Sequence, residues 1–375
     1  MAAAMALVGI PRRVWGQPEG EELVDFADLE GFKVESNRAT PRIKFFDLRR
    51  LTSWKTPEDE FFTFHQTETV TTDGSDWTLT IGGFVEKPLK LTLSQIRSRP
   101  DKRDLPVTIE CSGNGAGPGA NGMVSNGVWT GTGLAGLLQE CGIKNEAREI
   151  AFFGMDMERE RNSGNVTPHG RSLYLPDAMD SKAMLAYELN GKPLTAEHGF
   201  PLRLIIPGWY GMTQIKWLAH IEVMDRRYEG THMSRNYHTM LAAPPAIGDD
   251  VVLETSISKT LLKSVVARVT RRKGAEGGYL YKISGAAWGG PAAITNVEVR
   301  VDNGAWRGAT INERGGDFAW VLWSLDWTDA VPGPHTLISR AINANGSVQP
   351  TLQELRRTIK SIREDNSQWP RKIVL

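Results

Sequence analysis

The chain has 375 residues, of which 40% are hydrophobic and 23% charged, and this composition excludes a disordered chain and predicts two globular domains. Lysine plus arginine and aspartate plus glutamate both number 44, so no net positive field exists to attract nucleic acid, and a nucleic-acid partner is excluded. Beyond the N-terminus no run of about 18 apolar residues occurs, which predicts that the chain has no membrane span.

The first seventeen residues differ from the rest of the chain. Residues 1–10 are apolar and rich in small side chains, and Pro11-Arg12-Arg13 then interrupts them. This pattern is typical of the remnant of an export signal whose charged start is missing, and it predicts a periplasmic protein; a flexible N-terminal arm is the alternative. Residues 18–40 are predicted to form an N-terminal arm, and the polar stretch up to about Lys55 is expected to lie along the surface of the first domain.

Residues 41–245 are predicted to form the first domain, in which strands and helices are interleaved. Residues 77–81 alternate between apolar and polar as a strand does. Residues 92–99 have helical character, with a threonine as the first-residue cap and a proline directly after them. Residues 105–110 favour a strand and lead directly into Cys111, so this cysteine is expected at a strand end, in a glycine-rich loop.

The second half of the first domain has equally clear local signals. Residues 134–141 place three leucines and Cys141 at helical spacing, with a glycine next, so Cys141 is expected on the core face of a helix. Asn190-Gly191 is the strongest short signal for a tight hairpin, and it follows a strand-like run at 184–189. Residues 202–206 predict another strand. The domain is therefore predicted to be α+β, without the regular alternation of a doubly wound sheet.

The composition changes near residues 241–250, where alanine, proline, glycine and aspartate predict a linker and hence the domain boundary. Residues 246–375 are predicted to form an all-β, immunoglobulin-like sandwich, because short β-prone runs alternate there with glycine, asparagine and proline turns. These runs lie at residues 261–269, 279–285, 297–301, 318–323 and 335–342.

Cys111 has the strongest setting for chemistry in the chain. Only one other cysteine is present, and neither lies in C-x-x-C spacing, which excludes a disulfide framework and a structural zinc site. Glycines at 113, 115, 117 and 119 would let the backbone approach a bulky ligand closely. As a thiolate, cysteine binds soft or thiophilic metals, and a metal held by this one cysteine must bring most of its own ligands. The alternative is that Cys111 is a small buried hydrophobic residue.

The sequence Thr-Ile-Glu-Cys-Ser-Gly-Asn-Gly at 108–115 resembles the cysteine loop of the sulfite oxidase superfamily. Further motifs similar to that family lie at residues 129–134, 185–191, 198–203 and 215–218, and the resemblance extends from about Phe61 into the C-terminal sandwich. In the family one cysteine completes the coordination of a molybdenum held by a pterin dithiolene. The resemblance therefore implies a molybdopterin-binding α+β domain, an immunoglobulin-like dimerisation sandwich, and Cys111 as the catalytic metal ligand.

The resemblance also implies which side chains bind the cofactor. Residues that match positions holding the pterin and its phosphate are Asp156, His198, Arg203 and Lys216; the residues expected to add further contacts, mainly through the backbone, are Phe64, His65, Gln66, Gln214 and Ile215. Arg203 and Lys216 suit the anionic end of such a cofactor. Taken singly, Arg203 could instead be a solvent-facing residue at a strand edge, and His198 a turn histidine bonded to backbone.

Tyr237 resembles the tyrosine that approaches the reactive oxo ligand in sulfite oxidases, which implies a catalytic residue. A phenol there can donate a hydrogen bond while the oxygen atom is transferred. The alternative is an ordinary half-buried tyrosine that follows a strand. Trp129 is expected to form a wall of the pocket.

The sequence departs from the family where sulfite-oxidising members carry the arginines that surround their substrate. Phe64, Ala116 and the segment Pro291-Ala292-Ala293 stand at those positions, and none is charged. Because burying a dianion without cationic partners is costly, a sulfite site of the usual kind is not expected. Either His65, Arg235 and His238 compensate in part for the missing arginines, or the substrate is a less charged sulfur compound. The chain is thus identified as a member of the sulfite oxidase superfamily, bacterial and exported, that lacks the usual sulfite-binding arginines.

The function implied by the resemblance is oxygen-atom transfer on a small sulfur compound at a molybdenum–molybdopterin cofactor. The chain has no C-x-x-C-H haem attachment site, so no haem is expected in it, and an external electron carrier such as a c-type cytochrome is implied. A homodimer is expected from the sandwich. The alternatives are a molybdenum-dependent reductase of S-oxides on the same scaffold, a metal-free binding or scaffold protein that keeps the fold, and an adhesion module, against which the long first domain argues.

Overall fold

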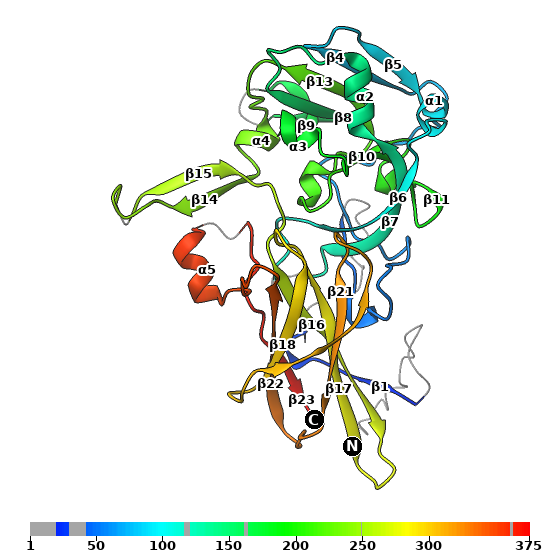
Figure 1. The fold of residues 1–375 in the computed structure, drawn as a ribbon. Coiled ribbons are helices and arrows are strands. Elements are labelled where there is room, and N and C mark those ends of the chain that lie inside the picture. The colour runs from blue at the N-terminus through cyan, green and yellow to red at the C-terminus, as the bar shows by residue number, and fades with distance from the viewer. Residues whose placement is uncertain (1–19, 30–42, 116–120, 161–163, 249, 361–362) are drawn as a thin grey trace, which may run out of the picture.

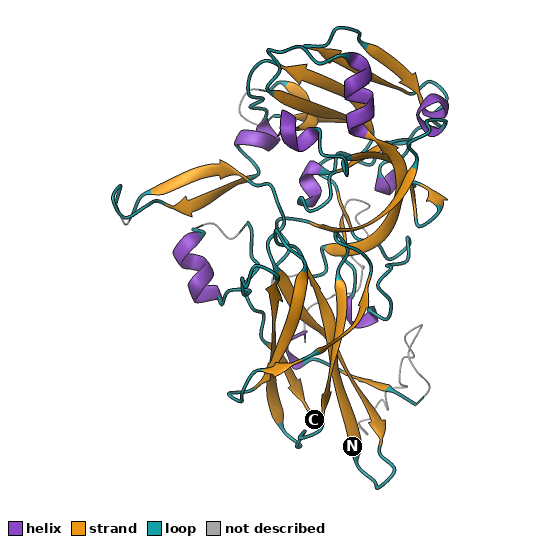
Figure 2. Cartoon of the chain, viewed as in Figure 1, coloured by secondary structure: helices purple, strands orange, loops and turns teal. Residues whose placement is uncertain are grey.

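The structure is a computed structural model that describes residues 20–29, 43–115, 121–160, 164–248, 250–360 and 363–375 (Figure 1). The predicted remnant of an export signal, residues 1–17, lies outside the described residues. One end of the molecule is built of sheets and short helices, and the other end is built almost entirely of strands (Figure 2). None of the helices in the described part of the chain combines the length and the apolarity that a membrane crossing needs.

The first domain contains two sheets. Their strands are β4 (Thr78–Gly83), β5 (Leu89–Thr92), β6 (Arg103–Glu110), β7 (Val124–Gly133), β8 (Glu149–Arg159), β9 (Val166–Tyr174), β10 (Met184–Leu189), β11 (Lys192–Pro193), β12 (Arg203–Ile205) and β13 (Leu218–Met224). One sheet has the order β5-β4-β13-β8-β9, in which only β4 and β13 run parallel. The other has the order β11-β10-β7-β6, with β12 also paired to β10. The domain is therefore α+β, with more residues in strands than in helices.

Short helices connect these strands. They are α1 (Leu93–Arg97), α2 (Leu134–Cys141), α3 (Leu175–Ala178) and α4 (Thr231–Ser234), together with 3-10 turns at Leu48–Arg50, Ala196–His198 and Gly211–Thr213. Thr92 caps α1 as predicted: its hydroxyl accepts the N–H of Gln95, and the Gln95 side chain accepts the N–H of Thr92. Gly142 ends α2 in the left-handed conformation, with φ of 66°. Cys141 is fully buried in the core of this domain, as predicted.

The predicted tight hairpin is also confirmed. Asn190 and Gly191 both have positive φ, 53° and 80°, and they connect β10 to β11. A two-residue turn of this hand matches the twist of the strands on either side, which explains why asparagine and glycine occur there.

The second domain is a sandwich of two sheets. Its strands are β1 (Glu22–Val24), β16 (Lys263–Lys273), β17 (Tyr279–Trp288), β18 (Ile294–Val301), β19 (Arg307–Gly308), β20 (Thr310–Arg314), β21 (Val321–Trp327), β22 (Pro334–Asn343) and β23 (Arg371–Val374). The sheets have the orders β1-β16-β17-β21-β20 and β19-β18-β22-β23. Val269 and Trp323 from one sheet pack with Val297 and Leu337 from the other. The β-prone runs of the sequence thus correspond to β16, β17, β18, β21 and β22; the helix α5 (Leu352–Thr358) was not predicted.

The prediction that the N-terminal arm lies along the first domain is wrong for its first described strand. Residues 22–24 form β1, which pairs antiparallel with β16 of the sandwich, and Asp28 accepts a hydrogen bond from Arg371 of β23 at 2.9 Å. An edge strand of a sheet offers unpaired backbone groups, and β1 satisfies those of β16. Further along, β2 (Ile43–Lys44) and β3 (Thr63–Phe64) pair with each other.

The prediction that residues 241–250 form an irregular linker is also wrong. The chain there forms a β-hairpin of β14 (His238–Ala242) and β15 (Val252–Ser256), which projects away from both domains (Figure 1). Prolines at 244 and 245 and the glycine at 248 lie in its turn region. Because turns and linkers favour the same residue types, local composition does not distinguish them.

The two domains share a hydrophobic core along β6 and β7. Val107 and Trp129 from these strands pack in one cluster with Val265, Trp288 and Trp320 from the sandwich. The N–H of Thr108 donates to the carbonyl of Phe318 at 2.8 Å, so β6 also contacts the second domain through its backbone. The strand that leads to Cys111 is therefore held by contacts with both domains.

Candidate functional site

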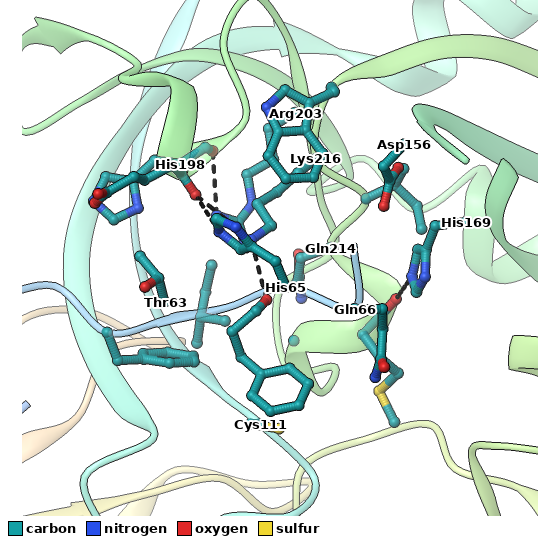
Figure 3. Close-up of a pocket in the computed structure, with 18 of the residues that line it drawn as sticks. Thr63, His65, Gln66, Cys111, Asp156, His169, His198, Arg203, Gln214 and Lys216 are labelled. Carbon is teal, nitrogen blue, oxygen red and sulfur yellow. Dashed lines mark hydrogen bonds between the residues drawn. The ribbon is translucent and has the colours of Figure 1, made fainter. Parts of the chain in front are cut away.

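One cavity collects the residues predicted as metal, cofactor and catalytic residues (Figure 3), whereas Trp129, expected as a pocket wall, is buried in the core behind Arg203 and does not line it. It holds about 690 Å³ of space that atoms do not fill, part of it open to solvent. Strand ends and short turns build its wall, which is where backbone leaves a sheet and side chains can converge. The predicted residues that line it are Phe64, His65, Gln66, Cys111, Asp156, His198, Arg203, Gln214, Ile215, Lys216 and Tyr237.

Cys111 lies directly after β6 and is half-buried in the cavity wall. Its N–H donates to the carbonyl of Met123, and its carbonyl accepts the N–H of Asn114, both at 2.9 Å, which closes a tight turn. Burial raises the pKa of the Cys111 thiol to about 11, although the N–H of Gly113 partly opposes this shift. A thiolate here therefore needs a compensating positive charge, which a bound metal ion provides.

Arg203 and Lys216 lie at the far side of the cavity from Cys111 (Figure 3). Arg203 is buried, its guanidinium lies over the ring of Trp129 at 5.0 Å, and it donates to the carbonyl of His198 at 3.3 Å. Lys216 donates to the carbonyl of Phe64 at 3.1 Å. No carboxylate of the described residues forms an ion pair with either cation, and Arg203 Nε has no hydrogen-bond partner.

Burial changes the acidity of both cations. Burial lowers the pKa of Arg203 to about 9. Burial, and secondarily the charge of Arg203, lower the pKa of Lys216 well below its usual value. Two like charges held side by side in a poorly solvated cavity are unfavourable unless an anion binds between them. This end of the cavity is therefore suited to an anionic ligand.

Asp156 adds an acceptor near the cations. It lies on β8, is buried, and its Oδ1 has no hydrogen-bond partner. Burial raises the pKa of Asp156 to about 6, and the charge of Lys216 partly opposes this. A Cβ at position 154 would stand 2.2 Å from this oxygen and 2.8 Å from the carbonyl of Lys216, so the carboxylate can occupy its position only beside Gly154. An unpaired buried carboxylate oxygen suits a ligand that donates N–H groups.

Two histidines are held by backbone carbonyls. His65 Nε2 donates to the carbonyl of Glu197 at 3.0 Å, and its Nδ1 accepts from the hydroxyl of Thr69 at 3.1 Å. His198 Nε2 donates to the carbonyl of Glu58 at 3.2 Å. Burial lowers the pKa of both imidazoles to about 3, so both are neutral at physiological pH.

Replacing His198 with glutamine is expected to reduce the acid sensitivity of the cofactor-free protein. The pKa of His198 is about 3 in the folded state and near 6.5 in the unfolded chain, so between these values the unfolded chain binds one more proton. The wild type therefore loses stability as the pH falls from 6.5 towards 3, by about 1.4 kcal/mol per pH unit for this group. Urea unfolding at pH 7 and pH 5 measures the difference; an equal loss in His198→Gln and wild type contradicts the assignment.

Gln214 and Ile215 reach the cavity wall but their polar groups are already bonded. The Gln214 amide donates to the carbonyl of Ile206 at 2.7 Å and accepts its N–H at 2.6 Å. The carbonyl of Ile215 accepts the N–H of Leu204 at 2.8 Å, and its side chain lies in the domain core. The prediction that both contribute backbone contacts to a ligand stays a prediction.

Tyr237 and Gln66 meet at the cavity. Gln66 Nε2 donates to the Tyr237 hydroxyl at 2.5 Å, and burial raises the pKa of Tyr237 to about 12. The N–H of Ile257 donates to the carbonyl of Tyr237 at 3.0 Å, so the residue is fixed where the chain enters the β14–β15 hairpin. The phenol is therefore neutral and can donate a proton in a hydrogen bond to a ligand.

The structure adds residues to the cavity that the sequence did not identify. His169, on β9, lines it and donates from Nε2 to the carbonyl of Met212 at 3.4 Å; burial lowers its pKa to about 3. Trp217 also lines it, with a positive φ of 51°, which is rare outside glycine. The only local signal for His169 was a histidine inside a β-prone run, which is too common to identify a site.

The structure differs for the three positions at which sulfite-oxidising family members are expected to carry arginines. Phe64 lines the cavity as predicted. Ala116 lies outside the described residues. The segment 291–293 does not line the cavity but lies in a mostly exposed turn between β17 and β18, so the prediction that it faces the substrate is wrong. Among the described residues no group of three or more histidine, cysteine, aspartate or glutamate side chains is arranged to hold a metal ion.

Comparison with known families identifies both domains. Residues 65–232 match the family described as "Oxidoreductase molybdopterin binding domain", and residues 254–373 match the "Mo-co oxidoreductase dimerisation domain". The residues of the cavity fit the cofactor of the first family: within the described part of the chain they offer two cations that form no ion pair, a carboxylate oxygen without a hydrogen-bond partner and, at the opposite side, one cysteine.

Individual relatives agree with this identification. The sulfite oxidase of Arabidopsis thaliana is 28% identical over 358 residues, covering 86% of this chain and 88% of the plant protein. An NADH nitrate reductase of Petunia hybrida is 31% identical over 295 residues, but the chain spans only 31% of its length. The solved sulfane dehydrogenase SoxCD of Paracoccus pantotrophus aligns with a TM-score of 0.77 at 27% identity, covering 90% of this chain and 87% of that one. The chain belongs to the sulfite oxidase superfamily of molybdopterin-dependent oxidoreductases.

Proposed function

We propose that this protein binds a molybdenum–molybdopterin cofactor and catalyses oxygen-atom transfer on a small sulfur compound. The observation that carries the proposal is the pair of cations, Arg203 and Lys216, which face the cavity without a carboxylate partner among the described residues. A protein that no longer bound an anion there would gain stability by replacing them, so a metal-free scaffold is disfavoured. When bound, the cofactor supplies two-electron redox chemistry at its metal.

Six polar residues of the cavity have a task in this proposal. Arg203 and Lys216 bind the anionic end of the cofactor, and Asp156 accepts hydrogen bonds from its ring. Cys111 provides the protein's sulfur ligand. The neutral hydroxyl of Tyr237 would donate a hydrogen bond to the oxygen that is transferred, while Gln66, which donates to that hydroxyl, fixes its orientation.

The cavity favours a substrate with little charge. Apart from the pair that binds the cofactor, no lysine or arginine of the described residues lines it. Its remaining wall is largely aromatic and aliphatic, formed by Phe61, Phe62, Phe64, Ile109, Met212 and Trp217. A doubly charged anion such as sulfite would be poorly stabilised there, whereas an S-oxide or a sulfane sulfur would not. The printed name of the structural relative, a sulfane dehydrogenase, supports the latter class.

The partners of the protein follow from the same proposal. An external carrier, such as a c-type cytochrome, exchanges the electrons. The sandwich, which we interpret as immunoglobulin-like, forms a homodimer; the match of its residues to a dimerisation domain supports this. Export to the periplasm, with residues 1–17 as the remnant of the signal, completes the proposal.

Metal and pterin analysis of protein produced in a host that makes the cofactor tests the proposal directly. We expect one molybdenum and one pterin per chain. Steady-state assays with sulfite and an oxidised cytochrome, and with methionine sulfoxide and a reduced dye, then separate oxidation from S-oxide reduction. Protein free of molybdenum and pterin under these conditions would overturn the proposal.

Replacing Phe64 with arginine is expected to increase the affinity of the cavity for divalent anions. Phe64 lines the cavity, and a charged hydrogen bond there should tighten the binding of sulfite, or of its inert analogue sulfate, by about tenfold or more. The inhibition constant of sulfate and the KM for sulfite measure the effect. Phe64→Gln is the matched polar control without charge; equal gains in both variants would show that charge does not limit anion binding.

A further inference from the structure

The turn that presents Cys111 is held by a side chain of the second domain. Glu110, the residue before the cysteine, and Lys263 of β16 are each 2% exposed, and Lys263 Nζ lies 3.2 Å from Glu110 Oε1. The two residues are 153 positions apart in the sequence and belong to different domains. A buried ion pair between domains therefore ends directly at the cysteine turn.

Lys263 contacts both ends of this turn. Besides Glu110, its ammonium donates to the carbonyl of Asn114 at 2.6 Å and to the carbonyl of Asp365 at 2.8 Å. Its three N–H donors are thus all used. The other oxygen of Glu110 accepts the indole N–H of Trp288, on β17, at 2.8 Å. Two strands of the sandwich therefore fix residues 110 and 114 from outside the first domain.

The turn is also bonded internally. The Asn114 amide donates to Glu110 Oε1 at 3.0 Å and accepts the N–H of Met123 at 2.9 Å. Asn114 and Cys111 are joined by a backbone hydrogen bond. Apart from the hydrogen bond of the Cys111 N–H to the carbonyl of Met123, these contacts run through Glu110 or Asn114, so the position of the cysteine backbone between them depends in part on the same cation.

Adhesion between the domains does not require this polar network. The apolar cluster that includes Val107, Val265 and Trp320 already joins them. A buried ion pair costs desolvation, and apolar residues of similar size usually hold an interface as well or better. What an ion pair with further hydrogen bonds adds is a unique geometry, since its bonds are directional.

We infer that Lys263 is a positioning residue for Cys111, so that the sandwich completes the metal-binding site as well as serving dimerisation. Lys263 clamps Glu110 and Asn114, and this clamp fixes the direction in which the Cys111 sulfur enters the cavity. The role that we assign to this clamp rests on the proposed function, because only a metal ligand needs its sulfur held so closely. The geometry of the clamp is independent of the cofactor.

Alkylation of Cys111 in cofactor-free protein tests the clamp. With peptide mass mapping to separate Cys111 from the buried Cys141, we expect iodoacetamide to react with Cys111 at least about tenfold faster in Lys263→Met than in wild type, because the turn opens more often. Lys263→Met combined with Glu110→Gln should react more slowly than Lys263→Met alone, since the double variant leaves no unpaired buried charge. Arg371→Met is the matched control: it breaks another buried ion pair of the sandwich, with Asp28, away from the turn.

The alkylation rates and the metal spectrum decide the inference. Faster alkylation in Lys263→Met but not in Arg371→Met supports it; equal rates in wild type and Lys263→Met, or equal increases in both variants, overturn it. In cofactor-loaded protein the thiolate-to-metal absorption of Lys263→Met should shift at unchanged molybdenum content, and an unchanged spectrum would also overturn it. If wild type binds no molybdenum, the proposed function fails, whereas the alkylation result still reports on the clamp.

Discussion

Serine in place of Cys111 is expected to reduce turnover by more than about 100-fold, because loss of residues that merely support a metal ligand already costs 10–100-fold in metal affinity or activity. The hydroxyl of Cys111→Ser is a far weaker acid than a thiol and does not replace a thiolate on a thiophilic metal. The absorption spectrum of the metal should therefore change together with activity, while the pterin content should stay close to that of wild type, because the site proposed for its phosphate end lies at the other side of the cavity.

Cys141→Ala is the control for this experiment. Cys141 is the last residue of α2, is buried in the core and does not line the cavity, so its loss should lower stability but leave turnover per bound molybdenum unchanged. Unchanged spectrum and turnover in Cys111→Ser would refute the assignment of Cys111 as the metal ligand.

Methionine in place of Arg203 is expected to have opposite effects on two properties. The cofactor-free variant should be more stable than wild type by about 1–4 kcal/mol, because a buried guanidinium without an ion-pair partner is replaced by an apolar chain of similar length. Cofactor retention should fall by at least about tenfold, because a charged hydrogen bond to a phosphate contributes roughly 1.5–3 kcal/mol. Thermal unfolding of cofactor-free protein and pterin content after dialysis measure the two effects.

Arg268→Met separates these effects from the general loss of a buried arginine. Arg268 is also buried, and burial lowers its pKa, but it contacts the carbonyl of Leu51 and does not line the cavity. Its replacement should leave cofactor retention unchanged. If Arg203→Met destabilises the cofactor-free protein while retaining the cofactor, Arg203 has a structural task and the proposed anion site is wrong.

Features that depend on a few neighbouring residues could be predicted from the sequence. The cap at Thr92, the helix end at Gly142 and the turn at Asn190-Gly191 follow from side-chain capping and from positive φ, which are properties of the local backbone. The position of Cys111 after a strand followed from the β-prone run before it. For the same reason the predictions failed where two structures use the same local composition, as in the hairpin at residues 241–250.

The candidate site was predicted by its motifs rather than by any one residue. Cys111, Arg203 and Lys216 were each ambiguous alone, and their order along the chain indicated the family. Phe64 was assigned correctly to the cavity, whereas residues 291–293 lie in a mostly exposed turn outside it, because similarity to a family position does not specify whether the residues of a turn reach the cavity.

By itself the sequence determined the local conformations, the order of the two domains and the family to which they belong. Only the tertiary structure decided which charges lack partners and which residues hold the cysteine turn. Arg203 and Asp156 are unusual because of what packs around them, and Glu110 meets Lys263 across 153 residues of chain. Desolvation and long-range pairing depend on the surroundings of a side chain in three dimensions, which local sequence patterns do not encode.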